Sequence, residues 1–426
     1  MTRILVCNPP AYLYNDKRHF IQAGSRWSFS MDAEKGNHKW PHYQPYPFAL
    51  GYAAAILKQE GYRVDAFDGS ALDMNEIEFM ERAIKSNPDI MMIEVPTVSF
   101  PLVMRLLNKI KNNIGCTIAV TGPHITALPG STEFEKLPGE WESHLPYDPI
   151  EFGDYPFPDR EFFPNEQYSN FEYARPSAQM LSSKGCHGRC TFCLEQHVIY
   201  KCRKIRTRTP ENVVDEMELL KENGAKGIWF DDMSITSKKG HIQGICNEIL
   251  DRGLDLPWSA FSCIGDENAT EETISLMSNA GCFGLAFGIE TITKKALKLA
   301  GKTYVSPESA KKFNQLLQKH EIHTVASYII GLPGETRDTI PKTIKFALDE
   351  LGSDSLQFAI ATPLPGTPFF KLCEQNGWLT TKEDWTRYDG ARHSVVNYPD
   401  LSGLEIEAFF KQAMWGREEK KMGFRK

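Results

Sequence analysis

Apolar and polar positions alternate along the first third of the chain in a way that predicts strands and helices in turn. Short β-rich runs are separated by stretches with apolar residues at helical spacing. The expected strands lie at residues 3–7, 63–67, 90–95 and 117–121, and the expected helices at 48–60, between 67 and 90, and at 103–114. Such alternation predicts parallel strands joined by crossover helices, so we expect an N-terminal doubly wound, Rossmann-like α/β domain. Ligands of such sheets bind outside the carboxyl ends of the strands.

The same alternation resumes after residue 178 and continues for longer. The expected strands lie at residues 179–182, 227–230, 258–262, 283–289, 324–330 and 355–360, with helices from residue 209 and at 241–250, 271–279, 307–319 and 338–350. These are about six β/α units, fewer than the eight of a closed barrel. We therefore expect a partial (β/α)6 TIM-like barrel with its chemistry at the carboxyl ends of the strands.

Between these two regions the periodicity is lost. Residues 136–175 are rich in Pro, Gly, Glu and aromatic side chains without a regular period, which is typical of a linker. The expected domains are therefore 1–135 and 176–370, followed by a small C-terminal cap and tail at 371–426. No stretch approaches the roughly 20 apolar residues of a membrane span, and no signal peptide is evident. We expect a cytoplasmic protein, in which thiols stay reduced.

Composition adds one unusual feature. The 426 residues are 41% hydrophobic and 24% charged, which is ordinary for a folded protein. The net charge of −7 and a single short basic run at residues 201–208 argue against a nucleic-acid surface. The ten cysteines are too few for a disulfide scaffold, yet numerous enough for some of them to hold a metal.

Three of these cysteines form a compact motif directly after the first strand of the second domain. Cys186-His-Gly-Arg-Cys190-Thr-Phe-Cys193 has the spacing C-x3-C-x2-C. Zinc normally needs four ligands, and only His187 and His197 are nearby candidates for the fourth. Three thiolates would instead leave one iron of a [4Fe–4S] cluster without a protein ligand, open to a substrate or cofactor. The motif favours the cluster over structural zinc.

With this motif the chain resembles the radical S-adenosylmethionine (SAM) superfamily, and in particular its cobalamin-binding subclass (class B). The resemblance extends over both domains. In the second domain it rests on Phe230-Asp-Asp232, Ala280-Gly-Cys-Phe, Phe287-Gly-Ile-Glu290-Thr, Gly331-Leu-Pro-Gly-Glu335 and Thr362-Pro-Leu-Pro-Gly-Thr367. In the first domain it rests on Asn8-Pro-Pro10, Pro45-Tyr-Pro-Phe-Ala-Leu-Gly51, Gly61-Tyr-Arg-Val64, Pro96-Thr97 and Thr121-Gly-Pro-His124-Ile-Thr126.

The resemblance implies which residues contact SAM at the rim of the barrel. Phe192 precedes the third cysteine, Asp231 and Asp232 could meet the methionine ammonium group, and Gly288 and Glu290 lie where the ribose would be bound. A carboxylate such as Glu290 suits ribose hydroxyls. Asp231 and Asp232 could equally be a helix-capping or salt-bridged pair, and Glu290 could be structural. Gly301-Lys302-Thr303 is similar to the end of a P-loop, but Ala296 replaces the first glycine of that motif.

The resemblance also implies a cobalamin site on the first domain. Its expected contacts are Pro9, Thr97, Ser99, Gly122, Pro123 and His124. Glycine permits a close approach of the backbone. The D-x-H-x-x-G loop with which many cobalamin domains bind cobalt is missing, so we expect His124 to contact cobalamin rather than to ligate cobalt.

One departure from the subclass concerns the end of the first domain. Most relatives have a further strand that ends in a V-x-G-E-G-E loop, whereas here the segment is reduced to Glu135-Lys-Leu-Pro-Gly-Glu140. Part of the cobalamin site would then be missing. An insertion at residues 12–43 could cover that gap or shape a substrate entrance.

The resemblance implies a radical SAM enzyme with a [4Fe–4S] cluster, SAM and cobalamin. Its expected reaction generates a deoxyadenosyl radical and transfers a methyl group to an unactivated carbon of a small-molecule, lipid or peptide substrate, with a flavodoxin or ferredoxin as electron donor. One alternative keeps the radical step but performs a rearrangement, cyclisation or oxidation. A second alternative is a non-enzymatic zinc-binding interaction protein. The sequence does not name the substrate.

Overall fold

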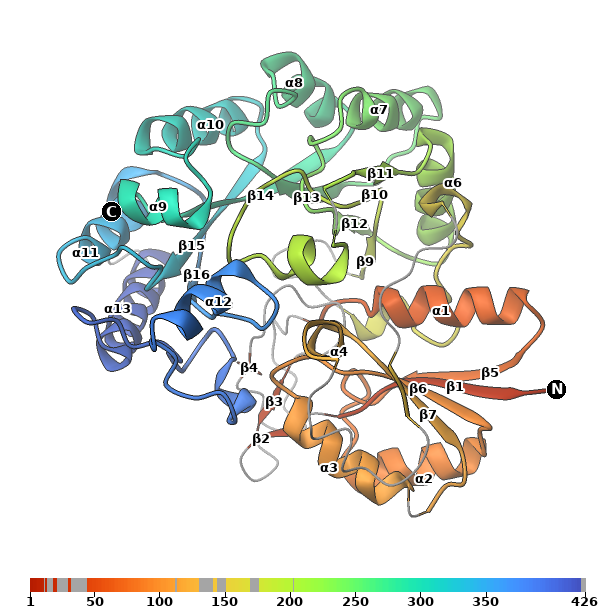
Figure 1. Cartoon of the computed structure of the whole chain (residues 1–426). Helices are drawn as coiled ribbons and strands as arrows, with labels where there is room; N and C mark the ends of the chain where they lie inside the picture. Colours follow the sequence, from red (N-terminus) through yellow and green to blue (C-terminus); the bar gives the residue numbers. More distant parts are fainter. Residues whose placement is uncertain are drawn as a thin grey trace.

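The computed structural model describes residues 1–10, 44–111, 113–129, 151–168, 176–201 and 203–422, together with the backbone of four short strands. These strands are β2 (Tyr12–Leu13), β3 (Arg18–Phe20), β4 (Ser30–Met31) and β8 (Trp141–Ser143). Figure 1 shows an N-terminal α/β layer in red and orange beside an open barrel in green and blue. Most of the insertion at residues 12–43, and residues 135–140, lie outside the described part of the chain.

The first domain is a five-stranded parallel sheet with the order β5-β1-β6-β7-β8. Its other strands are β1 (Arg3–Asn8), β5 (Arg63–Asp68), β6 (Ile90–Glu94) and β7 (Thr117–Thr121), and its helices are α1 (Phe48–Gln59), α2 (Glu76–Ser86), α3 (Phe100–Lys111) and α4 (Pro123–Ala127). Helix α1 covers one face of the sheet, and α2 and α3 cover the other (Figure 1). The predicted doubly wound α/β layer is confirmed.

Both faces of the sheet are apolar, which explains why helices cover both. In β1, Leu5 and Cys7 join the buried cluster beneath α2 and α3, while Ile4 and Val6 join the cluster beneath α1. Successive side chains of a strand point to opposite faces, so a continuous apolar run places one layer on each side.

The predicted linker is partly wrong. Residues 141–143, expected to be irregular, form strand β8, which pairs in parallel with β7. The following segment, with the short helices η1 (Phe152–Asp154) and η2 (Asn165–Gln167), packs against α1. Phe152 and Phe163 are fully buried in the same cluster as α1, and Lys58 pairs with Asp159 at 2.8 Å. Sequence periodicity misses this segment because it is ordered by tertiary contacts alone.

The second domain has six parallel strands with the order β16-β15-β14-β13-β12-β9. The strands are β9 (Ser177–Met180), β12 (Gly227–Phe230), β13 (Trp258–Ser262), β14 (Cys282–Glu290), β15 (His323–Ile330) and β16 (Ser355–Ile360). The helices are α6 (Pro210–Glu222), α7 (His241–Asp251), α8 (Glu271–Asn279), α9 (Lys294–Ala300), α10 (Pro307–Lys319), α11 (Ile340–Lys345) and the π-helix η4 (Phe346–Glu350). Each strand neighbours the next in sequence, which confirms the partial barrel. Helix α9 was not predicted.

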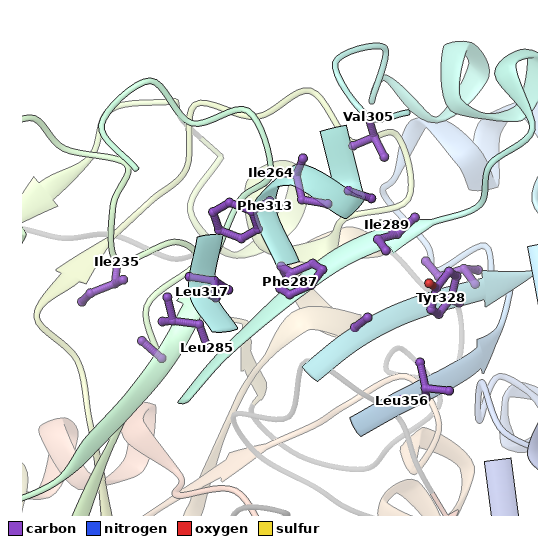
Figure 2. Close-up of a cluster of buried hydrophobic side chains, with 14 of the residues drawn as sticks. Ile235, Ile264, Leu285, Phe287, Ile289, Val305, Phe313, Leu317, Tyr328 and Leu356 are labelled. Atoms are coloured by element: carbon purple, nitrogen blue, oxygen red, sulfur yellow. The ribbon is translucent and has the colours of Figure 1, made fainter. Parts of the chain in front are cut away.

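Alternation along β14 separates the core of the barrel from its concave face. Figure 2 shows Leu285, Phe287 and Ile289 beside Phe313 and Leu317 of α10. The rings of Phe287 and Phe313 meet edge to face at 5.2 Å. The intervening residues of the strand, including the predicted site residues 288 and 290, therefore face the inside of the barrel.

The C-terminal segment is not a separate cap. Helix α12 (Pro368–Gln375) leads to a loop whose Trp385 and Tyr388 are buried in the core of the first domain. Helix α13 (Gly403–Lys421) then packs Ile406 and Phe410 into the core of the barrel. The segment thus joins both domains. Most of the expected tail from residue 417 is the last turn of α13, and residues 423–426 lie outside the described part. No helix among the described residues is both long enough and apolar enough to cross a bilayer.

Glu335 fixes the turn between β15 and α11. Its carboxylate accepts hydrogen bonds from the backbone of Gly331 (2.8 Å) and Leu332 (3.1 Å) and from the hydroxyl of Thr291 (2.7 Å). The motif at residues 331–335 is therefore a strand-to-helix turn. Burial raises the pKa of the Glu335 carboxyl group to about 7, although these hydrogen bonds oppose the shift.

This pKa predicts a pH dependence of stability. The folded protein holds the proton of Glu335 more tightly than the unfolded chain does, so its contribution to stability is present below about pH 4.5 and is lost as the pH rises through about 7. The difference amounts to about 3 kcal/mol. The melting temperature of the wild type minus that of Glu335→Gln should therefore fall by several degrees between about pH 5 and about pH 8. A difference that is constant with pH would contradict this explanation.

Candidate active site

The three motif cysteines lie at the carboxyl end of β9, on the long loop that joins the paired strands β10 (Ser183–Lys184) and β11 (Arg206–Thr207). All three are free thiols, and all three line one cavity of about 500 Å³. Gly188 lies between two of them: a Cβ atom at this position would be 3.2 Å from Cys186 Sγ and 3.8 Å from Cys190 Sγ. Its N–H donates to Cys186 Sγ at 3.3 Å. The predicted grouping of the thiols is thus present in the fold.

Side chains from the following segment hold the carbonyl groups of this loop. The segment contains the short π-helix η3 (Glu195–Ile199), a kind of turn that is frequent at functional sites. Arg203 donates to His187 O at 2.6 Å, and the side-chain amide of Gln196 donates to Gly188 O. The ring of His197 lies 3.1 Å from Cys190 O. The loop therefore keeps its shape through contacts that do not use the thiols.

A second set of contacts joins the loop to α9. The N–H of Thr191 donates to Ala300 O at 3.0 Å, and its hydroxyl donates to Leu299 O at 3.0 Å. Gly301 ends α9 with a φ of 75°, and a side chain there would collide with the carbonyl of Arg189. These contacts hold the cysteine loop against the C-terminal end of α9, the helix that follows β14.

The arrangement does not suit a single metal ion. Among the described residues no three Cys, His, Asp or Glu side chains are placed to hold one. His197, a candidate fourth zinc ligand, uses its ring for the loop carbonyl. Burial raises the pKa of Cys190 and raises that of Cys193 to about 12, so both thiols need a strong cation before they ionise. A multi-iron cluster supplies several cations and spreads its ligands more widely than one ion does.

The same cavity is also lined by a buried ion pair. Glu290 and Lys302 both line the cavity, and their side chains are 8% and 7% exposed. Lys302 Nζ lies 2.8 Å from Glu290 Oε1 and donates to Gly288 O at 2.7 Å. Burial lowers the pKa of Lys302, but the negative charge of Glu290 outweighs this effect and the pKa lies above its usual range.

The backbone at this pair is distorted. Glu290 has a φ of 65°, in the left-handed region that few side chains adopt, and the register between β14 and β15 shifts between residues 288 and 290. A Cβ atom on Gly288 would collide with Glu290 and lie 3.0 Å from Lys302 Nζ. Strained residues of this kind gather at functional sites, where the surrounding fold holds them.

Lys302 lines the cavity, although the sequence did not indicate it. The motif at residues 301–303 resembles only the end of a P-loop, and the helix that precedes Lys302 is not predicted from the sequence. Helix α9 returns the chain to the rim of the barrel, where the lysine meets the carboxylate of Glu290.

The other predicted SAM contacts divide into two groups. Phe192, Gly288 and Glu290 line the cavity together with the cysteines. Asp231 and Asp232 do not line it, although the next residue, Met233, does. Asp232 accepts hydrogen bonds from the backbone and hydroxyl of Ser182 and from the hydroxyl of Ser183. Asp231 accepts from the indole of Trp229 at 3.2 Å. These contacts favour the structural alternative for Asp232.

The six expected cobalamin contacts lie at the carboxyl edge of the first-domain sheet. Pro9, Thr97, Ser99 and His124 are buried, while Gly122 and Pro123 are partly exposed. Gly122 has a φ of 107°, and a Cβ atom there would lie 2.7 Å from Val95 N, so the fold itself requires this glycine. The sequence alone did not reveal that contact.

His124 has an unusual environment. Its ring stacks on Phe100 at 4.1 Å and meets Trp385 edge to face at 5.1 Å. Burial lowers its pKa to about 3, and neither ring nitrogen has a hydrogen-bond partner among the described residues. A buried polar atom without a partner costs stability, so its presence at a predicted ligand edge points to a group that would satisfy it.

Comparison with known proteins identifies the barrel. The family profile "Radical SAM superfamily" matches residues 180–347. An uncharacterized methyltransferase of Pyrococcus horikoshii is 28% identical over 384 residues, which cover 80% of this chain and 81% of that protein.

Solved structures extend the similarity over both domains. The radical SAM methyltransferase TsrM from Kitasatospora setae, with cobalamin and a [4Fe–4S] cluster bound, gives a TM-score of 0.66 at 19% identity and covers 96% of this chain and 85% of that chain. The cobalamin-dependent SAM radical enzyme OxsB gives 0.71 at 14% identity and covers 98% of this chain and 67% of that chain. At these identities the likeness shows the fold. The segment of residues 180–347, which forms most of the barrel, is therefore a radical SAM domain.

Proposed function

We propose that this protein uses SAM and cobalamin to transfer a methyl group to an unactivated carbon. The observation that carries the proposal is that three thiols and a buried Glu–Lys pair line one cavity at the carboxyl rim of a radical SAM barrel. The fold shared with TsrM and OxsB and the description of the Pyrococcus relative as a methyltransferase support it.

The residues of the cavity fit a [4Fe–4S] cluster with one open iron. Cys186, Cys190 and Cys193 would supply three thiolates from a loop whose shape is fixed by other contacts. When bound, the reduced cluster supplies the electron that cleaves SAM to a deoxyadenosyl radical, and cobalamin supplies the methyl group. The apolar lining, which includes Phe261, Ile264, Ile329 and Leu364, would keep water away from the reacting groups.

The ion pair suits the two ends of SAM. An ammonium group has three donors, and Lys302 uses two of them for Gly288 O and Glu290 Oε1, so one remains for the methionine carboxylate. Glu290 retains its second oxygen to accept from ribose hydroxyls. Asp231 and Asp232 remain candidates for the methionine ammonium group, although the hydrogen bonds of Asp232 favour Asp231 between the two.

The first domain offers a place for cobalamin beside this cavity. The partly exposed Gly122 and Pro123 would contact it, and the unpartnered ring of His124 fits a hydrogen-bonding group of its amide side chains. Thr97, Ser99 and His124 are all enclosed. Ser99 Oγ already donates to Pro96 O at 3.3 Å, whereas both ring nitrogens of His124 lack a partner among the described residues, so we expect His124 to be the contact among these three. No D-x-H-x-x-G loop is present in the sequence, which agrees with a contact role for His124.

A second candidate function keeps the radical step without methyl transfer, as in a rearrangement, cyclisation or oxidation. The observation that favours it is in the sequence, where the V-x-G-E-G-E segment of the subclass is reduced to residues 135–140. For either function we propose a flavodoxin or ferredoxin as the electron donor. The reducing cytoplasm would protect such a cluster.

Corrinoid retention tests the cobalamin part of the proposal. Anaerobically purified protein is mixed with hydroxocobalamin, passed through gel filtration, and its bound corrinoid is measured by absorbance. About one corrinoid per chain supports cobalamin-dependent methyl transfer, and weaker retention by His124→Phe would support the contact at that ring. No retention by the wild type would overturn the cobalamin part of the proposal and favour the second candidate.

A further inference from the structure

A fourth thiol faces the cavity that holds the three motif cysteines. Cys263 directly follows β13, at the carboxyl rim of the barrel, and lines the cavity together with Cys186, Cys190 and Cys193. It is half-buried, as are the three motif cysteines. Of the nine cysteines among the described residues, only these four are not fully buried.

The other thiols have a different environment. Cys7, Cys246, Cys282 and Cys373 lie in the hydrophobic cores, where a thiol acts as a small apolar side chain, as the sequence indicated for the first three. Cys263 belongs to none of the hydrophobic cores. Cys202, a further candidate for a reactive thiol, lies outside the described residues.

The surroundings of Cys263 are polar. Its neighbours in sequence, Ser262 and Asp266, line the same cavity and are joined through the hydroxyl of Thr236, which lies 3.0 Å from Ser262 Oγ and 2.9 Å from Asp266 Oδ2. This network fixes the loop after β13 and therefore the position of Cys263. Lys302 lines the same cavity, but burial outweighs its positive charge and raises the pKa of Cys263 to about 12, so this thiol, like Cys193, needs a bound cation before it ionises.

We propose that Cys263 ligates the open iron when SAM is absent and that SAM displaces it. This inference rests on the proposed function, because it requires the cluster. The Fe–S bond forms as the thiol gives its proton to water, and it breaks when the amino and carboxylate groups of SAM take the iron and the thiolate regains a proton. No electron is transferred in either direction. A soft thiolate is a better iron ligand than water, so the open site would be closed until SAM arrives.

The test compares wild type, Cys263→Ala and Cys263→Ser by electron paramagnetic resonance of the reduced cluster, with and without SAM. Without SAM the spectra of wild type and Cys263→Ala should differ, since only the former has four thiolates; with SAM they should coincide. Cys246→Ala, which removes a buried thiol that does not line the cavity, is the matched control and should match the wild type in both states. Iron content shows whether each variant assembles its cluster.

SAM affinity gives a second readout. If Cys263 occupies the iron in about nine-tenths of the molecules, its removal should tighten SAM binding about ten-fold, because the apparent affinity scales with the competent fraction. Identical spectra of wild type and Cys263→Ala without SAM, or unchanged affinity, would overturn the inference. If SAM alters the spectrum of none of the proteins, the proposed function itself fails, which is a different result.

Discussion

Replacing Cys190 by alanine is expected to abolish the cluster and with it all cleavage of SAM. The variant keeps two of the three motif thiolates, and Cys263, on the loop after β13, would face the open iron and not the iron that Cys190 would hold. The purified variant should lack the brown colour and contain far fewer than about four irons per chain. SAM cleavage should fall by at least about 100-fold, which is the loss of more than about 2.7 kcal/mol of transition-state stabilisation.

The variant should nevertheless fold. The loop is held by Arg203, Gln196 and His197 through its carbonyl groups and by Thr191 against α9, and none of these contacts uses a thiol. Circular dichroism should therefore match that of the wild type. Cys246→Ala, which deletes a thiol from the hydrophobic core, serves as the control and should keep its iron. A Cys190→Ala variant that retains colour and four irons would contradict the assignment of the ligands.

Replacing Lys302 by methionine is expected to damage both stability and SAM binding. Glu290 would be left as a buried carboxylate without its partner, and breaking a buried ion pair in this way costs about 3–5 kcal/mol. The cation that we assign to the methionine carboxylate would also be lost. We expect a melting temperature lower by several degrees and SAM binding weakened by at least about ten-fold, which corresponds to about 1.4 kcal/mol.

The double variant Lys302→Met with Glu290→Gln separates these two effects. Removing both charges leaves no unpaired ion, so most of the lost stability should return. SAM binding should stay weak, since neither the ammonium group nor the carboxylate is present. If the double variant bound SAM as tightly as the wild type, the pair would be purely structural.

Much of the fold could be predicted because its signals are local. Apart from β8, the strands of both sheets differ from the predicted ranges by only a few residues, since each is an apolar run bounded by turn residues. The helix expected from residue 209 also begins there, where the hydroxyl of Thr209 accepts from Asn212 N–H. The three cysteines could be predicted because a single loop carries all of them.

The features that were missed depend on contacts between distant segments. Lys302 becomes a site residue only because α9 returns it to Glu290, twelve residues earlier in the chain. The packing of Trp385 on His124 joins residues from opposite ends of the sequence. Strand β8 is recognisable only through its pairing with β7, and the apolar residues of the supposed linker only through their burial beside α1.

For Asp232 the sequence left two alternatives open, and its hydrogen bonds favour the structural one. A pair of acidic residues at the carboxyl end of a barrel strand suggested ligand binding, but the hydroxyls of Ser182 and Ser183 occupy this carboxylate. Nothing in the spacing of these residues distinguishes a carboxylate that faces the cavity from one that holds the neighbouring strand. Contact between Asp231 and the methionine ammonium group stays a prediction, which mutation of Asp231 would test.

The central claim is that the cavity holds a three-cysteine cluster at which SAM is bound and cleaved. The most direct test is to reconstitute the protein anaerobically with iron and sulfide, add SAM and dithionite, and quantify 5′-deoxyadenosine by mass spectrometry. We predict that wild type produces it and that Cys190→Ala does not. Intact SAM in the presence of a fully assembled cluster, or a colourless protein with stoichiometric zinc, would contradict the account.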